Sequence, residues 1–309
     1  MSGAARGKTA STAGLCEMPA QCGDCELRRT SLCRAASEAR GADVRPPRIR
    51  RLRRDEVIES EGESAHFMGV LRSGYLRRER MRPDGHRTVL GLACPGDLVG
   101  GLPGQRFAFS LEAATDAEIC SYDPQSVAHL LARDRVFHRS ILLEVCAQHE
   151  RQLDLIWQRG LLNSRERIMA FLVKACRIMP LERQPDGSVV VTIALSRRDW
   201  ADLSNTTVES ISRTLSQLAE KDLVVRISPQ RYRIRDLELL MRLAGMDPED
   251  TVGPRPWLGE EAAPAEPLSV SAGPSMRVVA VRPSRDSRPP LVRRRDSRGR
   301  RPPDLQQDA

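Results

Sequence analysis

The segment between residues 196 and 236 constrains the fold most, because it predicts two short helices separated by a tight turn. Ser196 is a suitable N-cap for a helix over RRDWADL, since its hydroxyl can accept a hydrogen bond from the first helical amides. Asn205 then falls where the chain has to turn, and asparagine tolerates the left-handed backbone conformation. Thr206 or Thr207 is expected to cap the second helix, VESISRTLSQLAEK. Helices separated by so few residues are typical of a helix-turn-helix.

The second helix has an apolar face and a polar face. The residues expected to be buried recur at intervals of three and four, namely Val208, Ile211, Leu215 and Leu218. A recognition helix presents the polar residues near its start to base edges, here Thr207, Glu209, Ser210, Ser212 and Arg213. Arginine can donate two hydrogen bonds to guanine, and glutamate can accept one from cytosine. The following LVVRISPQRYRI predicts a hairpin wing, with Arg231 and Arg233 placed for phosphates. The alternative for these charges is an ordinary solvated helix face.

Two different patterns precede this module. From about Ile49 to Asp123, short apolar runs alternate with Gly, Pro and Asp, and Pro83-Asp84-Gly85 is a strong turn signal. Many short strands predict a sandwich or barrel. From Pro124 to about Leu162, apolar residues recur at helical intervals, which predicts a helix of about 40 Å from roughly Asp134 to Gly160.

The long helix is expected to pair with a second copy of the chain. One face has a heptad-like spacing, and an adjacent face has further apolar and charged residues. The residues expected at the homodimer interface are Ile141, Val145, Arg151, Asp154, Leu155 and Gln158. The alternative is a helix that packs only on its own domain.

Cysteines are concentrated near the N-terminus. Cys16 is followed by C-x2-C-x7-C at Cys22, Cys25 and Cys33. Closely spaced thiolates can converge on one metal centre, and soft ligands suit zinc or an iron–sulfur cluster. The alternative is a mobile tail with incidental cysteines. Cys146 and Cys176 are expected to be core thiols, and Cys94, before Pro95 in a β-roll loop, is expected to be structural.

Composition excludes several classes of protein. The chain has no run of 18 apolar residues and no secretory signal, so we expect a cytoplasmic protein whose cysteines are thiols or metal ligands. The net charge of +8 is concentrated at the two ends and is weak evidence for nucleic acid by itself. Without a nucleophile–base pair, phosphate loop or carboxylate dyad, we do not expect an enzyme.

The order of strands, long helix and winged helix-turn-helix resembles the Crp/Fnr superfamily of bacterial transcription regulators. TVESISRTLSQL is similar to its recognition-helix signature, and LRSG and PGDLVG to its β-roll signatures. The resemblance implies an α+β fold in which an antiparallel β-roll, of the cyclic-nucleotide-binding jelly-roll kind, precedes the helices. The expected divisions are a Cys-rich metal-binding segment and connector at 1–47, a β-roll at 48–125, a dimerisation helix at 126–162, a winged helix-turn-helix at 163–245 and a disordered tail at 246–309.

The Fnr branch of this superfamily has an N-terminal cysteine cluster and one late cysteine in the β-roll, which Cys120 matches. This resemblance implies an oxygen-labile [4Fe–4S] cluster on Cys22, Cys25, Cys33 and Cys120, with Cys16 as an extra cysteine. It also implies that Glu209, Ser212 and Arg213 read a TTGAT-type half-site in a palindrome, and that Asp84 and Gly85 contact RNA polymerase. The stretch GDLVGGLPGQRFAF lacks the residues of the cyclic nucleotide pocket, so no cyclic nucleotide is expected.

We therefore expect an oxygen-responsive transcription regulator of anaerobic or microaerobic genes that dimerises when its cluster is intact. Two alternatives remain open. One is a zinc-stabilised protein that binds DNA constitutively, since four cysteines also suit zinc. The other is a regulator that senses nitric oxide through the same cysteines.

Overall fold

The computed structural model describes residues 25–29, 31–38, 45–85, 87–102 and 104–246. The predictions for Cys16, for Cys22 and for the tail beyond Met246 lie outside these residues.

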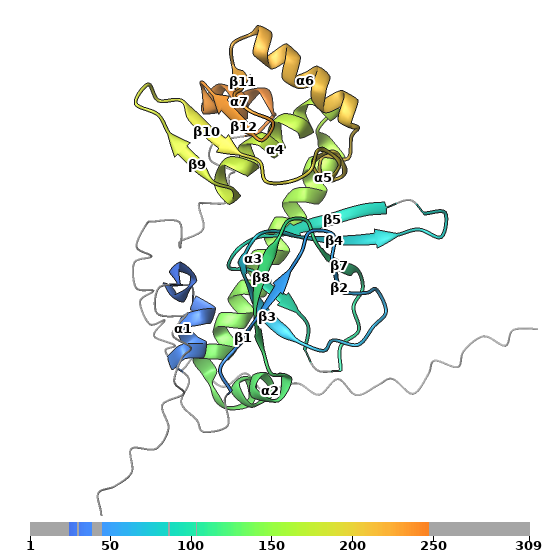
Figure 1. Ribbon diagram of the computed structural model, residues 1–309, viewed down its shortest axis with the longest axis vertical. Helices are drawn as coiled ribbons and strands as arrows, with labels where there is room; N and C mark the ends of the chain where they lie inside the picture. The colour runs from blue at the N-terminus through green and yellow to red at the C-terminus, as the bar shows by residue number, and fades with distance from the viewer. Residues whose placement is uncertain (1–24, 30, 39–44, 86, 103, 247–309) are drawn as a thin grey trace, which may run out of the picture. The chain divides into compact units, whose positions relative to one another are not determined.

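The first part of the described chain forms two four-stranded antiparallel sheets (Figure 1). The first has the order β1 (Arg48–Leu52), β8 (Ala117–Tyr122), β3 (Met68–Ser73), β6 (Leu98–Gly100). The second has the order β2 (Val57–Glu59), β7 (Ser110–Ala113), β4 (Leu76–Met81), β5 (Arg87–Ala93). Alternate residues of both sheets form one buried apolar cluster that includes Leu71, Leu76, Leu111 and Ile119. The predicted antiparallel β-roll is confirmed.

The motif LRSG ends at a position that only glycine fits. Gly74 has a φ of +78°, and a Cβ there would lie 2.2 Å from the carbonyl oxygen of Asp116. The left-handed backbone and the close approach both exclude a side chain. This turn connects β3 of one sheet to β4 of the other.

Two helices follow the β-roll. Asp123 caps α2 (Pro124–Arg133), and Asp134 caps α3 (Arg135–Leu161) by accepting from the amides of Val136 and Phe137 at 2.9 and 2.8 Å. The long helix occurs where the sequence predicts it. The N-terminal 3-10 turn η2 (Glu26–Arg29) and helix α1 (Ser31–Glu38) share a buried apolar cluster with β3, β8 and α3. The outer face of the first sheet is therefore covered by helices.

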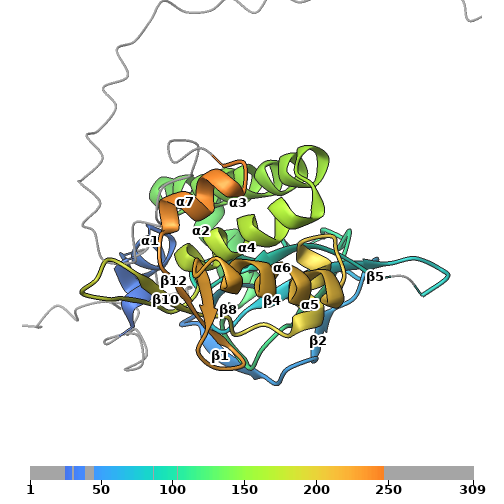
Figure 2. The same ribbon diagram turned by 90° about the horizontal axis from the view of Figure 1, so that it is seen from above.

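The remaining elements form a winged helix-turn-helix (Figure 2). They are α4 (Ser164–Ile178), β9 (Leu181–Arg183), β10 (Val189–Thr192), α5 (Arg197–Leu203), α6 (Val208–Glu220), β11 (Val224–Arg226), β12 (Arg231–Ile234) and α7 (Leu237–Leu243). The strands form one sheet in the order β11-β12-β10-β9. Its core contains Trp200 between Phe171 and Tyr232, with ring centroids 5.1 and 6.0 Å apart.

Candidate nucleic-acid interface, dimer face and cysteine site

The two helices of the predicted reading module are joined by a turn of the expected kind. Ser196 caps α5, Thr207 caps α6, and Asn205 between them has a φ of +47°. A residue that sequence reasoning missed holds this turn in place. Arg167 on α4 donates from Nε to the carbonyl of Ser204 at 2.8 Å and from Nη2 to that of Asn205 at 3.0 Å. These bonds satisfy carbonyls that the end of α5 leaves without a helical partner.

Helix α6 exposes the polar residues that were predicted to read bases. Glu209, Ser212 and Arg213 are exposed, while Ile211 and Leu218 are fully buried. Hydrogen bonding near the helix N-terminus lowers the pKa of Glu209, so the side chain stays an acceptor. One expectation was wrong, because Val208, the first residue of α6, is 37% exposed and does not reach the core.

The predicted wing is present as the hairpin of β11 and β12. Its arginines are already paired within the chain. Arg231 donates to both carboxylate oxygens of Glu182 at 2.8 and 2.7 Å, and Arg233 donates to Asp186 at 2.6 Å. Because these pairs are partly exposed, they contribute little to stability and can be exchanged for a phosphate contact. The phosphate role of Arg231 stays a prediction.

Helix α3 packs its predicted dimer seam on its own domain. Ile141 and Leu155 are 8% and 9% exposed, and Gln158 is also buried. Arg151 forms an ion pair with buried Asp97 at 2.8 Å, and Asp154 accepts from Gln158 at 2.9 Å. These contacts within the chain occupy most of the side chains that the sequence assigned to a second copy.

Helix α3 leaves an apolar surface uncovered, and most of its residues lie one position after those of the predicted seam. We call it the outer stripe. Its members are Leu142, Val145, Leu153 and Ile156, which are 58%, 48%, 51% and 66% exposed. Cys146 on the same helix is exposed, so the expectation of a core thiol was wrong there, whereas Cys176 is buried as expected; Cys94 is buried too. An exposed apolar stripe of this length on one helix is typical of an interface.

The structure brings three of the four predicted cluster ligands to one side of the first sheet. Cys120 on β8 lies directly opposite Val70 on β3, and directly opposed residues point to the same face. Val70 belongs to the apolar cluster under η2 and α1, against which Cys25 and Cys33 pack. Cys120 therefore faces the N-terminal segment, while its neighbour Ile119 faces the core of the β-roll.

These cysteines suit a metal centre in their chemistry, because soft thiolates bind zinc and iron–sulfur clusters. Three thiols share one face of one sheet, and the fourth predicted ligand, Cys22, lies outside the described residues. Within the part of the chain that is described, no three cysteine, histidine or acidic side chains are close enough to hold a metal ion. Assembly of a centre would therefore require the N-terminal segment to close further on Cys120.

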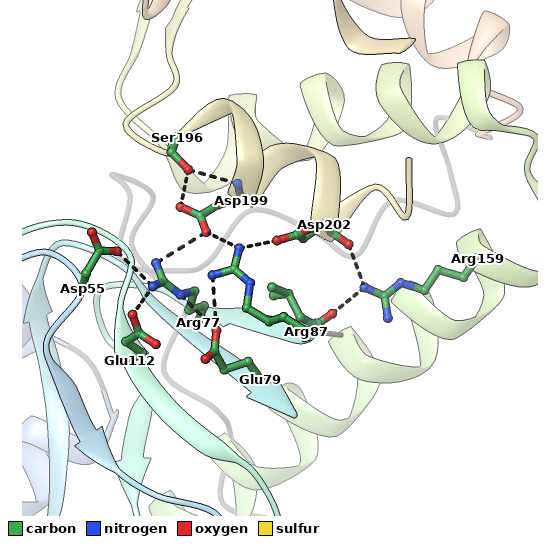
Figure 3. Close-up of polar contacts among 10 residues, drawn as sticks. Asp55, Arg77, Glu79, Arg87, Glu112, Arg159, Ser196, Asp199 and Asp202 are labelled. Atoms are coloured by element: carbon green, nitrogen blue, oxygen red, sulfur yellow. Dashed lines mark hydrogen bonds and ion pairs between the residues drawn. The ribbon is translucent and has the colours of Figure 1, made fainter. Parts of the chain in front are cut away.

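A buried charge cluster joins the β-roll to the helix-turn-helix (Figure 3). Arg77 on β4 is 4% exposed and contacts Asp55, Glu79, Glu112 and Asp199. Arg87 on β5 contacts Glu79, Asp199 and Asp202. Asp199 and Asp202 belong to α5, so two arginines of the β-roll hold the first helix of the reading module.

This cluster contains more carboxylates than arginines, which affects their protonation. Burial, with the neighbouring carboxyl of Glu79, raises the pKa of Glu112 to about 7, although Arg77 opposes the shift. The carboxyl of Glu112 therefore takes up or releases its proton near neutral pH. The sequence gives no sign of it, because Arg77 and Asp199 are 122 residues apart.

The turn predicted to contact RNA polymerase lies at the end of the β4–β5 hairpin. Asp84 and Gly85 are exposed, and Gly85 donates to the carbonyl of Arg82 at 2.9 Å. The polymerase contact itself stays a prediction. Among the described residues, no helix is both long and apolar enough to cross a bilayer.

Comparisons with known proteins agree with this architecture. Residues 49–134 match the model of the cyclic nucleotide-binding domain, and residues 166–243 match that of the Crp-like helix-turn-helix domain. The chain is 31% identical to the transcriptional activatory protein AadR of Rhodopseudomonas palustris, over 59% of this chain and 74% of that protein. It is 25% identical to the transcriptional activator protein FnrL of Cereibacter sphaeroides, over 74% and 93% of the two chains. The structure is similar to FixK2 from Bradyrhizobium japonicum, with a TM-score of 0.59 and 23% identity, over 64% and 96% of the two chains.

Proposed function

We propose that this chain, which belongs to the Crp/Fnr family of transcription regulators, binds palindromic DNA as a homodimer whose formation depends on a [4Fe–4S] cluster. The observation that carries the proposal is the placement of Cys120, which faces the same apolar cluster against which Cys25 and Cys33 pack. A ligand set confined to the N-terminal segment could not report to the rest of the chain. One that includes Cys120 joins this segment to the β-roll.

The residues that would hold the cluster are Cys22, Cys25, Cys33 and Cys120. When bound, such a cluster supplies sensitivity to oxygen, because its thiolate-held iron is lost on oxidation. The chain's own part is mechanical. Helix α1 packs against α3 in a cluster that contains Phe137 and Ile141, so fixing the N-terminal segment fixes the start of the long helix.

The outer stripe of α3 is the surface through which two copies would pair. Burying Leu142, Leu153 and Ile156 would each contribute about 1 to 2 kcal/mol, since they are roughly half exposed in one chain. Pairing places two α6 helices for two half-sites, and a single half-site gives too little affinity for specific binding. We infer that Glu209, Ser212 and Arg213 read a TTGAT-type half-site.

Regulation of the target genes would follow from contact with RNA polymerase. Asp84 and Gly85 form an exposed turn that is suitable for such a contact. AadR and FnrL are named as activators, and we propose activation of anaerobic or microaerobic genes for this chain too. We propose no cyclic nucleotide ligand, because the pocket residues of that branch are missing from GDLVGGLPGQRFAF.

Anaerobic purification tests the proposal. The full chain should contain iron and acid-labile sulfide and should show visible charge-transfer absorbance. It should sediment as a dimer that dissociates on exposure to air. Stoichiometric zinc with oxygen-independent DNA binding would select the zinc-stabilised alternative. A cluster that nitric oxide but not oxygen destroys would select the regulator that senses nitric oxide.

A further inference from the structure

A cavity lies where α3, α4, β5 and the end of α5 meet, outside both the cysteine site and the DNA-reading face. Its volume is about 40 Å³. The side chains that give it its chemistry are Arg151, Arg159, Arg167, Phe171, Lys174 and Ser204. A void of this size holds about three water molecules, which is the volume of a small ion and far below that of a nucleotide.

The cavity has a positive lining that the protein neutralises only in part. Arg151 pairs with Asp97 at 2.8 Å, and Lys174 lies 3.9 Å from Asp154. Arg159 and Arg167 form no ion pair with any carboxylate in the described part of the chain, and they donate mainly to backbone carbonyls. Two guanidinium charges therefore line a half-buried space without a counterion.

Electrostatics indicates that an anion belongs in this space. Burial, together with the positive charge of Arg167, lowers the pKa of Arg159. The two guanidinium groups therefore destabilise each other, and an anion between them would relieve this. The unpartnered Nε of Arg159 and hydroxyl of Ser204 have almost no surface open to water, so these two atoms do not face the cavity.

Much of the remaining wall is apolar. Leu92, Leu155 and Phe171 line the cavity beside the cations. An apolar wall disfavours a strongly hydrated dianion such as phosphate and favours a carboxylate with a short hydrocarbon part. We propose that this cavity binds a small carboxylate of the size of acetate or propionate, with the carboxylate beside the guanidinium groups of Arg159 and Arg167.

The position of the cavity gives the ligand a route to the reading module. Ser204 ends α5, and its carbonyl is held by Arg167, which also fixes Asn205 in the turn before α6. Arg159 already connects β5 to α5 through the carbonyls of Val89, at 2.5 Å, and Asp202, at 3.4 Å (Figure 3). A carboxylate held here would add its contacts to the same junction.

A second copy of the chain would leave the cavity open. The α3 residues that line it belong to the face packed on the β-roll and α4, roughly a third of a turn around the helix from the outer stripe. The proposed site is thus separate from the cysteine site. Its ligand can be bound or absent whatever the cysteines bind.

A ligand-observed NMR titration of the full chain, in chloride-free buffer and with matched ionic strength, tests the site. Propionate should bind saturably with one site per chain, and propionamide, which has the same shape without the charge, should not bind. Arg159→Gln should weaken propionate binding at least tenfold.

Arg165→Gln is the matched control, because this exposed residue of α4 lies outside the cavity and its loss changes the net charge equally. It should bind propionate as the unaltered chain does. The proposal is overturned if propionate does not saturate, if propionamide binds equally well, or if Arg165→Gln and Arg159→Gln behave alike. Equal affinity for inorganic phosphate would overturn the assignment to carboxylates.

Discussion

Arg77 offers the sharpest test of how the β-roll holds the reading module. Its side chain is 5% exposed, whereas that of Arg80 on the same strand is 58% exposed and pairs with Glu61. Arg77→Met and Arg80→Met remove the same charge and replace it with the same side chain. The two variants therefore differ mainly in burial and in the number of carboxylates left without a partner.

The expected costs follow from this difference. Removing one partner of a buried ion pair typically destabilises a protein by about 3 to 5 kcal/mol, because the other charge stays buried and unpaired. An exposed pair contributes about 0 to 1 kcal/mol. Arg77→Met leaves Glu79 and Asp199 facing each other across the junction with only Arg87 between them, so we expect a cost near the top of the first range.

Denaturant unfolding of the full chain at pH 7.5, followed by intrinsic fluorescence, measures both costs. Trp200 is a useful reporter because it is buried next to Asp199 in α5. The penalty of Arg77→Met should shrink at pH 5, where the abandoned carboxyls can take up protons. If this variant does not fold at pH 7.5, Arg77→Lys keeps one charge and should be intermediate. A loss within 1 kcal/mol of that of Arg80→Met at pH 7.5 would refute the reasoning.

Three further predictions concern single positions. Glu112→Gln should flatten the pH dependence of stability. The raised pKa of about 7 means that the folded state binds this proton more tightly than the unfolded state, so stability should fall by up to about 3 kcal/mol as pH rises from about 4.5 to beyond 7; an unchanged slope in the variant would contradict this. Leu153→Ala should weaken dimerisation in sedimentation experiments with little loss of stability, whereas Leu155→Ala should cost about 2 to 5 kcal/mol of stability, and the reverse pattern would return the interface to the face expected from sequence. Arg213→Met should cost about 1 to 3 kcal/mol of DNA affinity and relax specificity at one base pair, and a loss that is uniform across sequences would show a phosphate contact instead.

The reading module could be predicted because its signals are local. Caps, a turn residue and an apolar period lie within a few residues of one another, and Ser196, Asn205 and Thr207 take the expected roles. The N-terminus of α4 shows the limit of such signals. Asn163 caps this helix through a capping box with Glu166, but the neighbouring Ser164 is an equally suitable capping residue by sequence, so the sequence alone does not choose between them.

The dimer face could not be assigned from sequence because α3 has apolar residues on more than one side. Gln148 looks like a polar position in a seam, but it lies against the β-roll, where it accepts from Arg78 at 2.7 Å and donates to the carbonyl of Leu98 at 3.0 Å. Only the partners on β4 and β6 decide which side of the helix is covered. The charge cluster around Arg77 was invisible for the same reason, since its carboxylates come from two strands, a loop and a helix.

The most direct test of the central proposal compares the anaerobic and aerobic DNA affinity of the unaltered chain with that of Cys120→Ala. The account predicts that the unaltered chain binds a palindromic site tightly without oxygen and loses this binding, together with its iron, after exposure to air. The variant should lack the cluster and bind weakly in both conditions. A Cys120→Ala protein that keeps its iron and its response to oxygen would contradict the account.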